Sequence, residues 1–129
     1  MPQLTQRTLS VINSSLAVGG YTLIPGMAVT LLTGAGWVDI RLQALVENTY
    51  AGINRIGLTF ALDGVAMNDV PGAVASVSIP EDCWGTLGLH YAMRIGAGQH
   101  VLTALGFCTN ANATIYQDHA LFTVYELGF

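Results

Sequence analysis

The side chains able to bind metals or do chemistry are few, and three of them are histidines. A zinc site needs three or four ligands that the fold brings together. His90, His100 and His119 are candidates, and the first two could lie across one hairpin. Neither a cysteine nor a carboxylate joins them at a recognised spacing, so we expect no metal site. His100 opens a strand after Gly98, where we expect a structural hydrogen bond.

Cys83 and Cys108 are too few for a disulfide framework. Proteins assembled in the cytosol seldom rely on disulfides, and a free cysteine is more often a small buried hydrophobe. Whether the two cysteines pair stays open at this point. Cys108 also lacks the ordered base and orienting group that thiol catalysis requires.

The loop carboxylates do not match a known site either. Calcium takes six or more oxygen ligands, and Asp63, Asn68 and Asp69 do not follow the spacing of a calcium-binding loop. Glu81 and Asp82 are adjacent, and adjacent residues on an extended chain point apart. We therefore predict solvated carboxylates and no catalytic residue.

A glycine turn, Gly96-Ala97-Gly98, begins like a dinucleotide-binding fingerprint. The third glycine is missing, because position 101 is valine, and no helix follows. The motif is typical of a hairpin turn, and we predict no cofactor.

Aromatic residues offer one binding chemistry, since their rings can stack on the apolar faces of sugars. Trp37, Tyr50, Trp84 and Tyr116 are the candidates. Packing in the core or between subunits is the competing use of such rings.

The composition points to a covered surface. The 129 residues suit one domain, and only 9% are charged while 52% are hydrophobic; ordinary soluble domains carry about 25% charged residues. A membrane helix needs ~20 consecutive apolar residues, and the chain has no such run. We infer that other subunits cover much of the surface. The net charge of -4 and the lack of a basic patch exclude nucleic-acid binding.

Alternating apolar and polar residues predict strands rather than helices. The pattern is clear at 37–46, 54–62 and 87–95, and a strand–turn–strand unit follows from 87 to 107. About eight antiparallel strands are expected, in a β-sandwich or barrel. Residues 1–9 form a polar arm in this interpretation, and residues 10–129 a single domain. The N-terminal sequence carries no secretion signal.

The last third of the chain contains three notable stretches: Gly98-Gln99-His100-Val101-Leu102-Thr103, Asn110-Ala111-Asn112-Ala113-Thr114-Ile115 and Ala120-Leu121-Phe122-Thr123-Val124-Tyr125-Glu126-Leu127. In these stretches the chain resembles virion structural proteins of tailed bacteriophages that have trimeric, C1q/TNF-like jelly-roll domains. The resemblance implies an all-β jelly-roll sandwich and a non-enzymatic homotrimer of the capsid decoration (cement) type. Such a protein would be made in the host cytoplasm and would bind the major capsid protein on the capsid surface of the virion, with no membrane partner.

We expect the outward sides of the predicted strands 37–46 and 54–62 to contact other subunits. The outward side of 54–62 is nearly uncharged, which is unusual for a strand facing water. Four residues represent these sides: Trp37, Arg41, Thr59 and Ala61. The arm is expected to dock on the shell through Gln3, Leu4 and Arg7. The alternative function is a receptor- or glycan-binding tip or head-fibre domain, with a sugar held near Tyr50, Trp84 and Tyr116.

Overall fold

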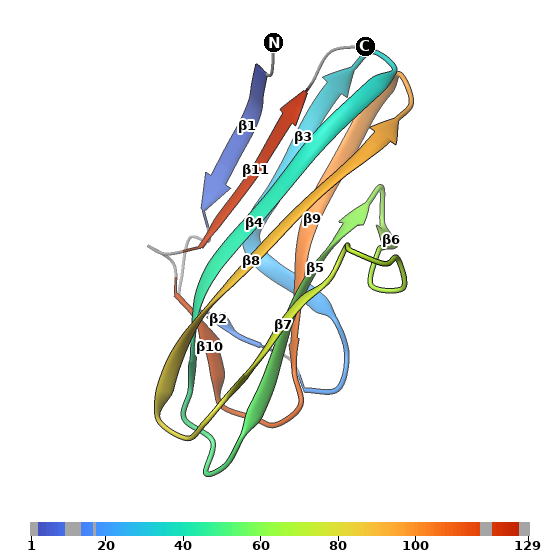
Figure 1. Ribbon diagram of the computed structural model, residues 1–129. Coiled ribbons are helices and arrows are strands. Elements are labelled where there is room, and N and C mark those ends of the chain that lie inside the picture. The colour runs from blue at the N-terminus through green and yellow to red at the C-terminus, as the bar shows by residue number, and fades with distance from the viewer. Residues whose placement is uncertain (1–2, 10–13, 17, 117–119, 127–129) are drawn as a thin grey trace.

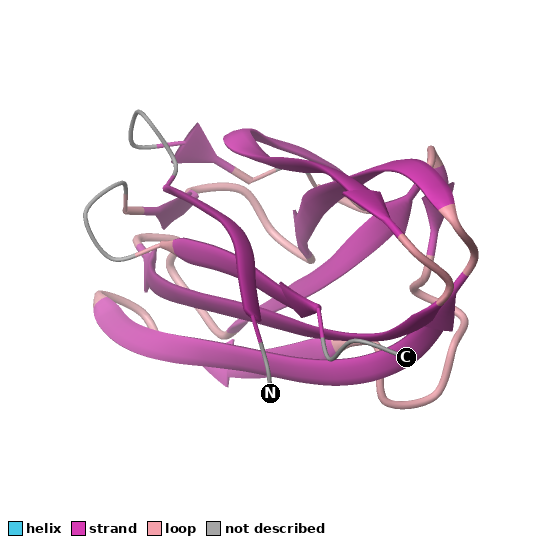
Figure 2. Ribbon diagram, turned by 90° about the horizontal axis from the view of Figure 1, so that it is seen from above, coloured by secondary structure: helices cyan, strands magenta, loops and turns pink. Residues whose placement is uncertain are grey.

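A computed structural model describes residues 3–9, 14–16, 18–116 and 120–126, and within them every regular element is a strand. Two sheets pack face to face (Figure 1, Figure 2). Sheet A contains β1 (Gln3–Leu9), β2 (Ser14–Ser15), β4 (Gly36–Asn48), β8 (Cys83–Ile95), β10 (Ala113–Ile115) and β11 (Leu121–Glu126). Sheet B contains β3 (Thr22–Thr33), β5 (Asn54–Leu62), β6 (Val65–Ala66), β7 (Ala75–Ile79) and β9 (Gly98–Cys108).

β4 is the central strand of sheet A. It pairs with β8 along one edge, and with β11 and then β10 along the other; β1 lies beyond β11 and β2 beyond β10. In sheet B the order is β3, β9, β5, and both β6 and β7 pair with the far edge of β5. All these pairs are antiparallel, and the chain repeatedly crosses between the sheets, as from β3 to β4 to β5 and from β7 to β8 to β9. The predicted all-β jelly-roll sandwich is confirmed.

Strand alternation decides which side chains form the core. On β4, Ile40 and Leu42 are 0% exposed, and on β5 so are Leu58 and Phe60. Their neighbours in the sequence lie on the outer faces of the two sheets. The alternation predicted for 37–46 and 87–95 is therefore confirmed, whereas on β5 both sides are buried from Ile56 to Ala61.

The predicted N-terminal arm needs correction for residues 3–9, which form β1. This strand is antiparallel to β11, with Gln3 in register with Glu126 and Arg7 with Thr123. A polar edge strand is held by backbone hydrogen bonds and leaves no apolar alternation in the sequence.

The strand count is also higher than about eight. β6 and β10 have only two and three residues, too few to show a period. β8 begins at Cys83, four residues before the predicted alternation at 87–95, because β4 extends to Asn48 and pairs with β8 over its whole length.

Two buried asparagines fasten the lower end of the sandwich, which we define as residues 49–53, 80–82 and 109–112. Asn48 is 0% exposed. Its amide nitrogen donates to the carbonyls of Gly52 (2.8 Å) and Ile79 (2.9 Å), and its oxygen accepts from the Tyr50 N–H at 2.9 Å. Asn54 donates to the same oxygen at 3.2 Å.

Asn54, also 0% exposed, extends this network to the loop after β9. Its amide nitrogen donates to the Asn110 carbonyl at 2.7 Å, and its oxygen accepts from the Asn110 N–H at 3.0 Å. Buried amides with several partners favour one loop arrangement, since an unpaired buried polar group is costly. The lower end is thus a preorganised support for the strands that meet there.

The outer face of sheet B carries an aromatic pair over Gly57. Tyr21 and Phe107 meet edge to face, with ring centroids 4.6 Å apart. A Cβ added at Gly57 would lie 2.2 Å from the Phe107 Cε1 atom and 2.8 Å from the Tyr21 hydroxyl. The absence of a side chain at Gly57 lets the pair pack on the sheet.

Gly57→Ala is expected to lower the free energy of unfolding by about 1–3 kcal/mol, because the added methyl group overpacks this site. Urea denaturation of the purified variant measures the change. Gly88→Ala is the matched control, since nothing lies within 4 Å of its added Cβ. Equal unfolding free energies for the two variants would contradict the packing explanation.

Candidate functional site

The outer face of sheet A is the surface richest in aromatic and charged side chains. We call it the outer A face and define it by residues of β4, β8 and β11 that share the side opposite the core: Trp37, Asp39, Arg41, Gln43, His90, Arg94, Thr123 and Tyr125. In register across the sheet, Arg41 lies opposite both His90 and Thr123. Alternation along β4 puts its outward residues on one side, and the cross-strand register adds those of β8 and β11 to the same side.

Asp39 is the buried charge of this face. It is 8% exposed and lies between two basic side chains. Its Oδ2 is 3.1 Å from Arg41 Nη2, and its Oδ1 is 2.5 Å from His90 Nε2. These contacts compensate a carboxylate that would otherwise resist burial.

The two arginines of the outer A face also lie against aromatic rings. The Arg41 Cζ atom is 5.2 Å from the centre of the Tyr125 ring, and the Arg94 Cζ atom is 5.4 Å from the centre of the Trp37 ring. Such cation–π contacts stabilise both guanidinium groups, and that of Arg41 also pairs with Asp39. The face therefore presents Trp, Tyr and Arg, the residue types enriched at the centres of protein interfaces.

The four residues predicted as subunit contacts fall into two groups. Trp37 is 39% exposed, and Arg41 is exposed on the outer A face. Thr59 and Ala61 are 0% and 4% exposed within the single chain, and the Thr59 hydroxyl donates to the Ala73 carbonyl at 2.6 Å. The outward side of β5 has few charged residues because other parts of the same chain cover it. The role of Thr59 and Ala61 in subunit contact stays a prediction.

Of the three predicted sugar-binding aromatics, the structure brings two together. Trp84 and Tyr116 stack with ring centroids 4.6 Å apart and an interplanar angle of 30°. The Tyr116 hydroxyl donates a short hydrogen bond to Glu47, which raises the pKa of Tyr116 and keeps the phenol protonated. Tyr50 lies on the neighbouring loop with its ring over Gly52.

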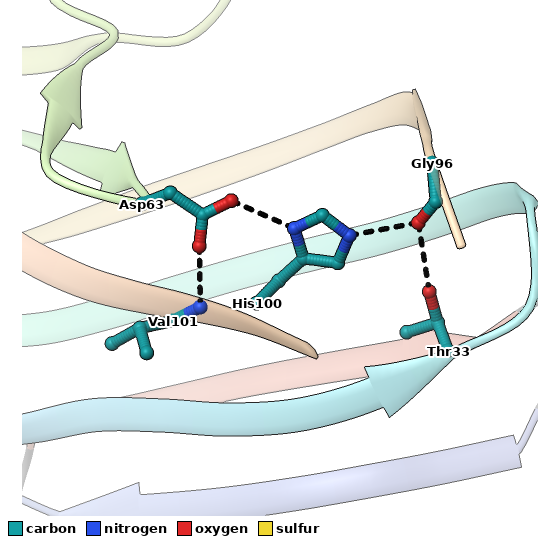
Figure 3. A network of polar contacts seen from close by, with 5 residues as sticks. All are labelled: Thr33, Asp63, Gly96, His100 and Val101. Carbon is teal, nitrogen blue, oxygen red and sulfur yellow. Dashed lines mark hydrogen bonds and ion pairs between the residues drawn. The ribbon is translucent and has the colours of Figure 1, made fainter. Parts of the chain in front are cut away.

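His100 forms the centre of a polar network at the opposite, upper end of the sandwich (Figure 3). Its Nδ1 is 2.7 Å from an Asp63 carboxylate oxygen, and its Nε2 is 2.7 Å from the Gly96 carbonyl oxygen. The other Asp63 oxygen accepts from the Val101 N–H at 2.8 Å, and the Thr33 hydroxyl donates to the Gly96 carbonyl at 3.2 Å. The structural hydrogen bond predicted for His100 is confirmed.

Both ring nitrogens of His100 face acceptors, so the full set of hydrogen bonds requires the doubly protonated imidazolium. The hydrogen bond to Asp63, and then that to Gly96, raises the pKa of His100. The same bond from His100 lowers the pKa of Asp63. The network links the end of β3 to the turns after β5 and β8.

The sequence did not reveal the acidic partners in these clusters. Nothing in the sequence linked Asp39, Glu47 or Asp63 to a partner, because the main partners His90, Tyr116 and His100 are distant in the sequence. Asp39 carried the only usable signal, since it lies between Trp37 and Arg41 on the outward side of a clearly alternating strand.

Cys83 and Cys108 are not joined by a disulfide, which answers the question of their pairing. Cys108 is buried, its thiol donates to the Leu16 carbonyl at 3.5 Å, and burial raises its pKa. In the described part of the chain no three or more His, Cys, Asp or Glu side chains gather where they could hold a metal ion. Among the same residues, no helix is long and apolar enough to cross a membrane.

No protein-family model and no curated protein sequence matches this chain. Solved structures do match it. A crystal structure of murine APRIL at pH 5.0 covers 96% of this chain and 98% of its own, at 15% identity and a TM-score of 0.64. Eiger TNF from S. frugiperda covers 99% and 94%, at 11% identity and a TM-score of 0.62.

The fold is a TNF-like jelly roll. A third similar structure, dimeric latent PorU from Porphyromonas gingivalis, matches 97% of this chain but only 13% of its own, at 10% identity and a TM-score of 0.52. Because the APRIL and Eiger structures cover 96% and 99% of this chain, the TNF-like jelly roll extends over almost all of it. At these identities the likeness concerns the fold alone.

The His100 network makes stability depend on pH in a defined direction. The raised pKa of His100 stabilises the fold fully below the unfolded value of about 6.5, and this contribution is lost as pH rises through the folded pKa. The lowered pKa of Asp63 stabilises above about 3.8 and is lost as pH falls through its folded value. The window of full stabilisation thus lies between about pH 4 and 6.5.

His100→Gln is expected to lessen the decline in unfolding free energy as pH rises above about 6.5, because the variant lacks the titrating imidazole. Chemical denaturation at several pH values measures it, with His90→Gln as the control, which keeps the His100 network. An unchanged pH profile in His100→Gln would contradict the assignment of an imidazolium.

Proposed function

We propose that this chain is a non-enzymatic capsid decoration protein of a tailed bacteriophage, which associates as a homotrimer on the outer surface of the shell. Its partner would be the major capsid protein, and its location the virion. The observation that carries the proposal is the outer A face, where aromatic side chains and internally compensated charges suit a protein contact. The resemblance to trimeric C1q/TNF-like virion proteins supplies the phage context.

The roles of the polar clusters support a non-enzymatic function. His100 with Asp63 links turns, His90 with Arg41 compensates Asp39, and Tyr116 is bonded to Glu47. Each pair thus has a structural use. A nucleophile activated by a base and an orienting group, as acyl-transfer chemistry requires, does not arise from these pairs.

Reinforcement of a shell needs only modest affinity at each site. Buried apolar surface contributes roughly 25 cal/mol per Å², before the cost of association is subtracted. Trimer formation multiplies the contacts that one decoration unit makes with the shell. Repetition over the capsid then resists internal pressure.

Trp37→Asp is expected to shift the assembled protein towards single subunits, because it removes the exposed indole and puts a charged group in the proposed contact. Light scattering at matched concentrations measures the shift. Leu32→Asp is the control, since Leu32 is 78% exposed on strand β3 of the other sheet. Dissociation by Leu32→Asp but not by Trp37→Asp would place the contact on sheet B instead.

β1 is the proposed shell contact, through Gln3, Leu4 and Arg7. Arg7→Glu is expected to weaken binding to capsids that lack the decoration protein, measured by co-sedimentation, because it reverses one of the few positive charges of the chain. Arg55→Glu is the matched control, because Arg55 is the exposed residue of the largely buried β5 of sheet B. Equal binding of both variants would remove the β1 contact from the proposal.

A further inference from the structure

The stacked pair Trp84 and Tyr116 lies on the same outward side of sheet A, near the lower end, where it is not explained by subunit or shell contact. Trp84 is the second residue of β8 and lies in register with Glu47, near the end of β4. Thr114 of β10 lies on the other side of Glu47. Trp84 is 52% exposed, an unusual exposure for a tryptophan that also contacts another ring. The cluster combines an open aromatic face, a carboxylate and a neighbouring hydroxyl-bearing strand position.

The orientation of these side chains is fixed from several directions. The backbone N–H of Tyr116 donates to the Leu45 carbonyl at 3.1 Å, and its hydroxyl donates to Glu47. The tilted stack then sets the plane of the Trp84 ring. Asn48, the residue after Glu47, is held by the buried network of the lower end. A rigid, preorganised platform of this kind loses little entropy on binding.

The charges nearby select the class of ligand. Glu47 is acidic, while Arg94 is stacked on Trp37 near the other end of β4, some ten residues or ~33 Å away along the strand. An anionic ligand would therefore meet a carboxylate without a neighbouring cation at this cluster. A neutral ligand with hydroxyl donors and one apolar face fits both the ring and the carboxylate.

We propose that Trp84, Tyr116 and Glu47 form a binding site for neutral glycans. The apolar face of a pyranose ring lies on the exposed Trp84 indole, and sugar hydroxyls donate to the Glu47 carboxylate. A carboxylate has about four acceptor positions, of which the Tyr116 hydroxyl takes one. Tyr116 acts as a positioning residue, since it backs the indole and orients the carboxylate.

The site is separate from the proposed subunit contact at Trp37. A decoration protein with such a site would attach the particle to glycans on a surface, in addition to reinforcing the shell. Glycan binding does not depend on the capsid proposal, because the cluster lies within one chain. The two proposals can therefore fail independently.

The test is a glycan array that carries neutral and sialylated glycans, probed with the labelled full-length chain. Wild type is expected to bind neutral glycans, and Trp84→Ala and Glu47→Gln to bind them at least roughly tenfold more weakly. Leu32→Ala is the matched control, because it removes another exposed large apolar side chain, on β3 of the other sheet, and its binding is expected to stay unchanged. Glu47→Gln keeps the shape of the side chain, so it answers the question even where Trp84→Ala fails to fold.

Two results would overturn the site: absence of neutral-glycan binding by the wild type, or binding that both variants retain. A preference for sialylated glycans would overturn the assignment of a neutral ligand. Acrylamide quenching in a Trp37→Phe variant, where Trp84 is the remaining tryptophan, reports whether the ring is open in the assembled protein. A Trp84 ring shielded from acrylamide would also contradict the proposal.

Discussion

β4 is hydrogen-bonded along both edges, to β8 on one side and to β11 and β10 on the other. This double pairing fixes its register, and a slip by one residue would exchange its buried and outward side chains. Val38, Ile40 and Leu42 then fill the core, while Trp37, Asp39 and Arg41 share the outer A face. The proposed subunit contact and the proposed glycan site lie along this one strand, near its beginning and its end.

The two ends of the sandwich are closed by different chemistry. Buried amides of Asn48 and Asn54 hold the lower end, and these groups do not titrate near neutral pH. The upper end depends on His100 and Asp63, whose bond changes with protonation. The hydrogen bonds of the upper end therefore depend on pH, whereas the asparagine network of the lower end does not titrate near neutral pH.

Much of the fold could be predicted from the sequence, because the central strands must bury one face and expose the other. The stretches that became β4, β5 and β8 show this period clearly. β1 could not be predicted, since a polar edge strand gains its stability from backbone pairing with β11. Asn48 and Asn54 were equally hidden, because asparagine in a sequence suggests a turn rather than a buried anchor.

The candidate sites were predictable by residue type but not by partner. A hydrogen bond for His100 was expected from its place after a glycine turn, yet Asp63 lies 37 residues earlier in the chain. Trp84 and Tyr116 were grouped as aromatics, and their contact depends on β4 standing between β8 and β10. The sequence pattern predicts which side chains share one side of a strand. Which side chains meet across strands depends on the order of the strands in the sheet, which the pattern does not give.

The low charge of the chain is the reason to expect a covered surface. A single chain exposes 6551 Å² of surface. Only four arginines and eight aspartates or glutamates are available to keep that surface in water. Sedimentation equilibrium of the wild-type protein tests this most directly. The account predicts a mass three times the 13.6 kDa of one chain. A mass of one chain at all concentrations would contradict it.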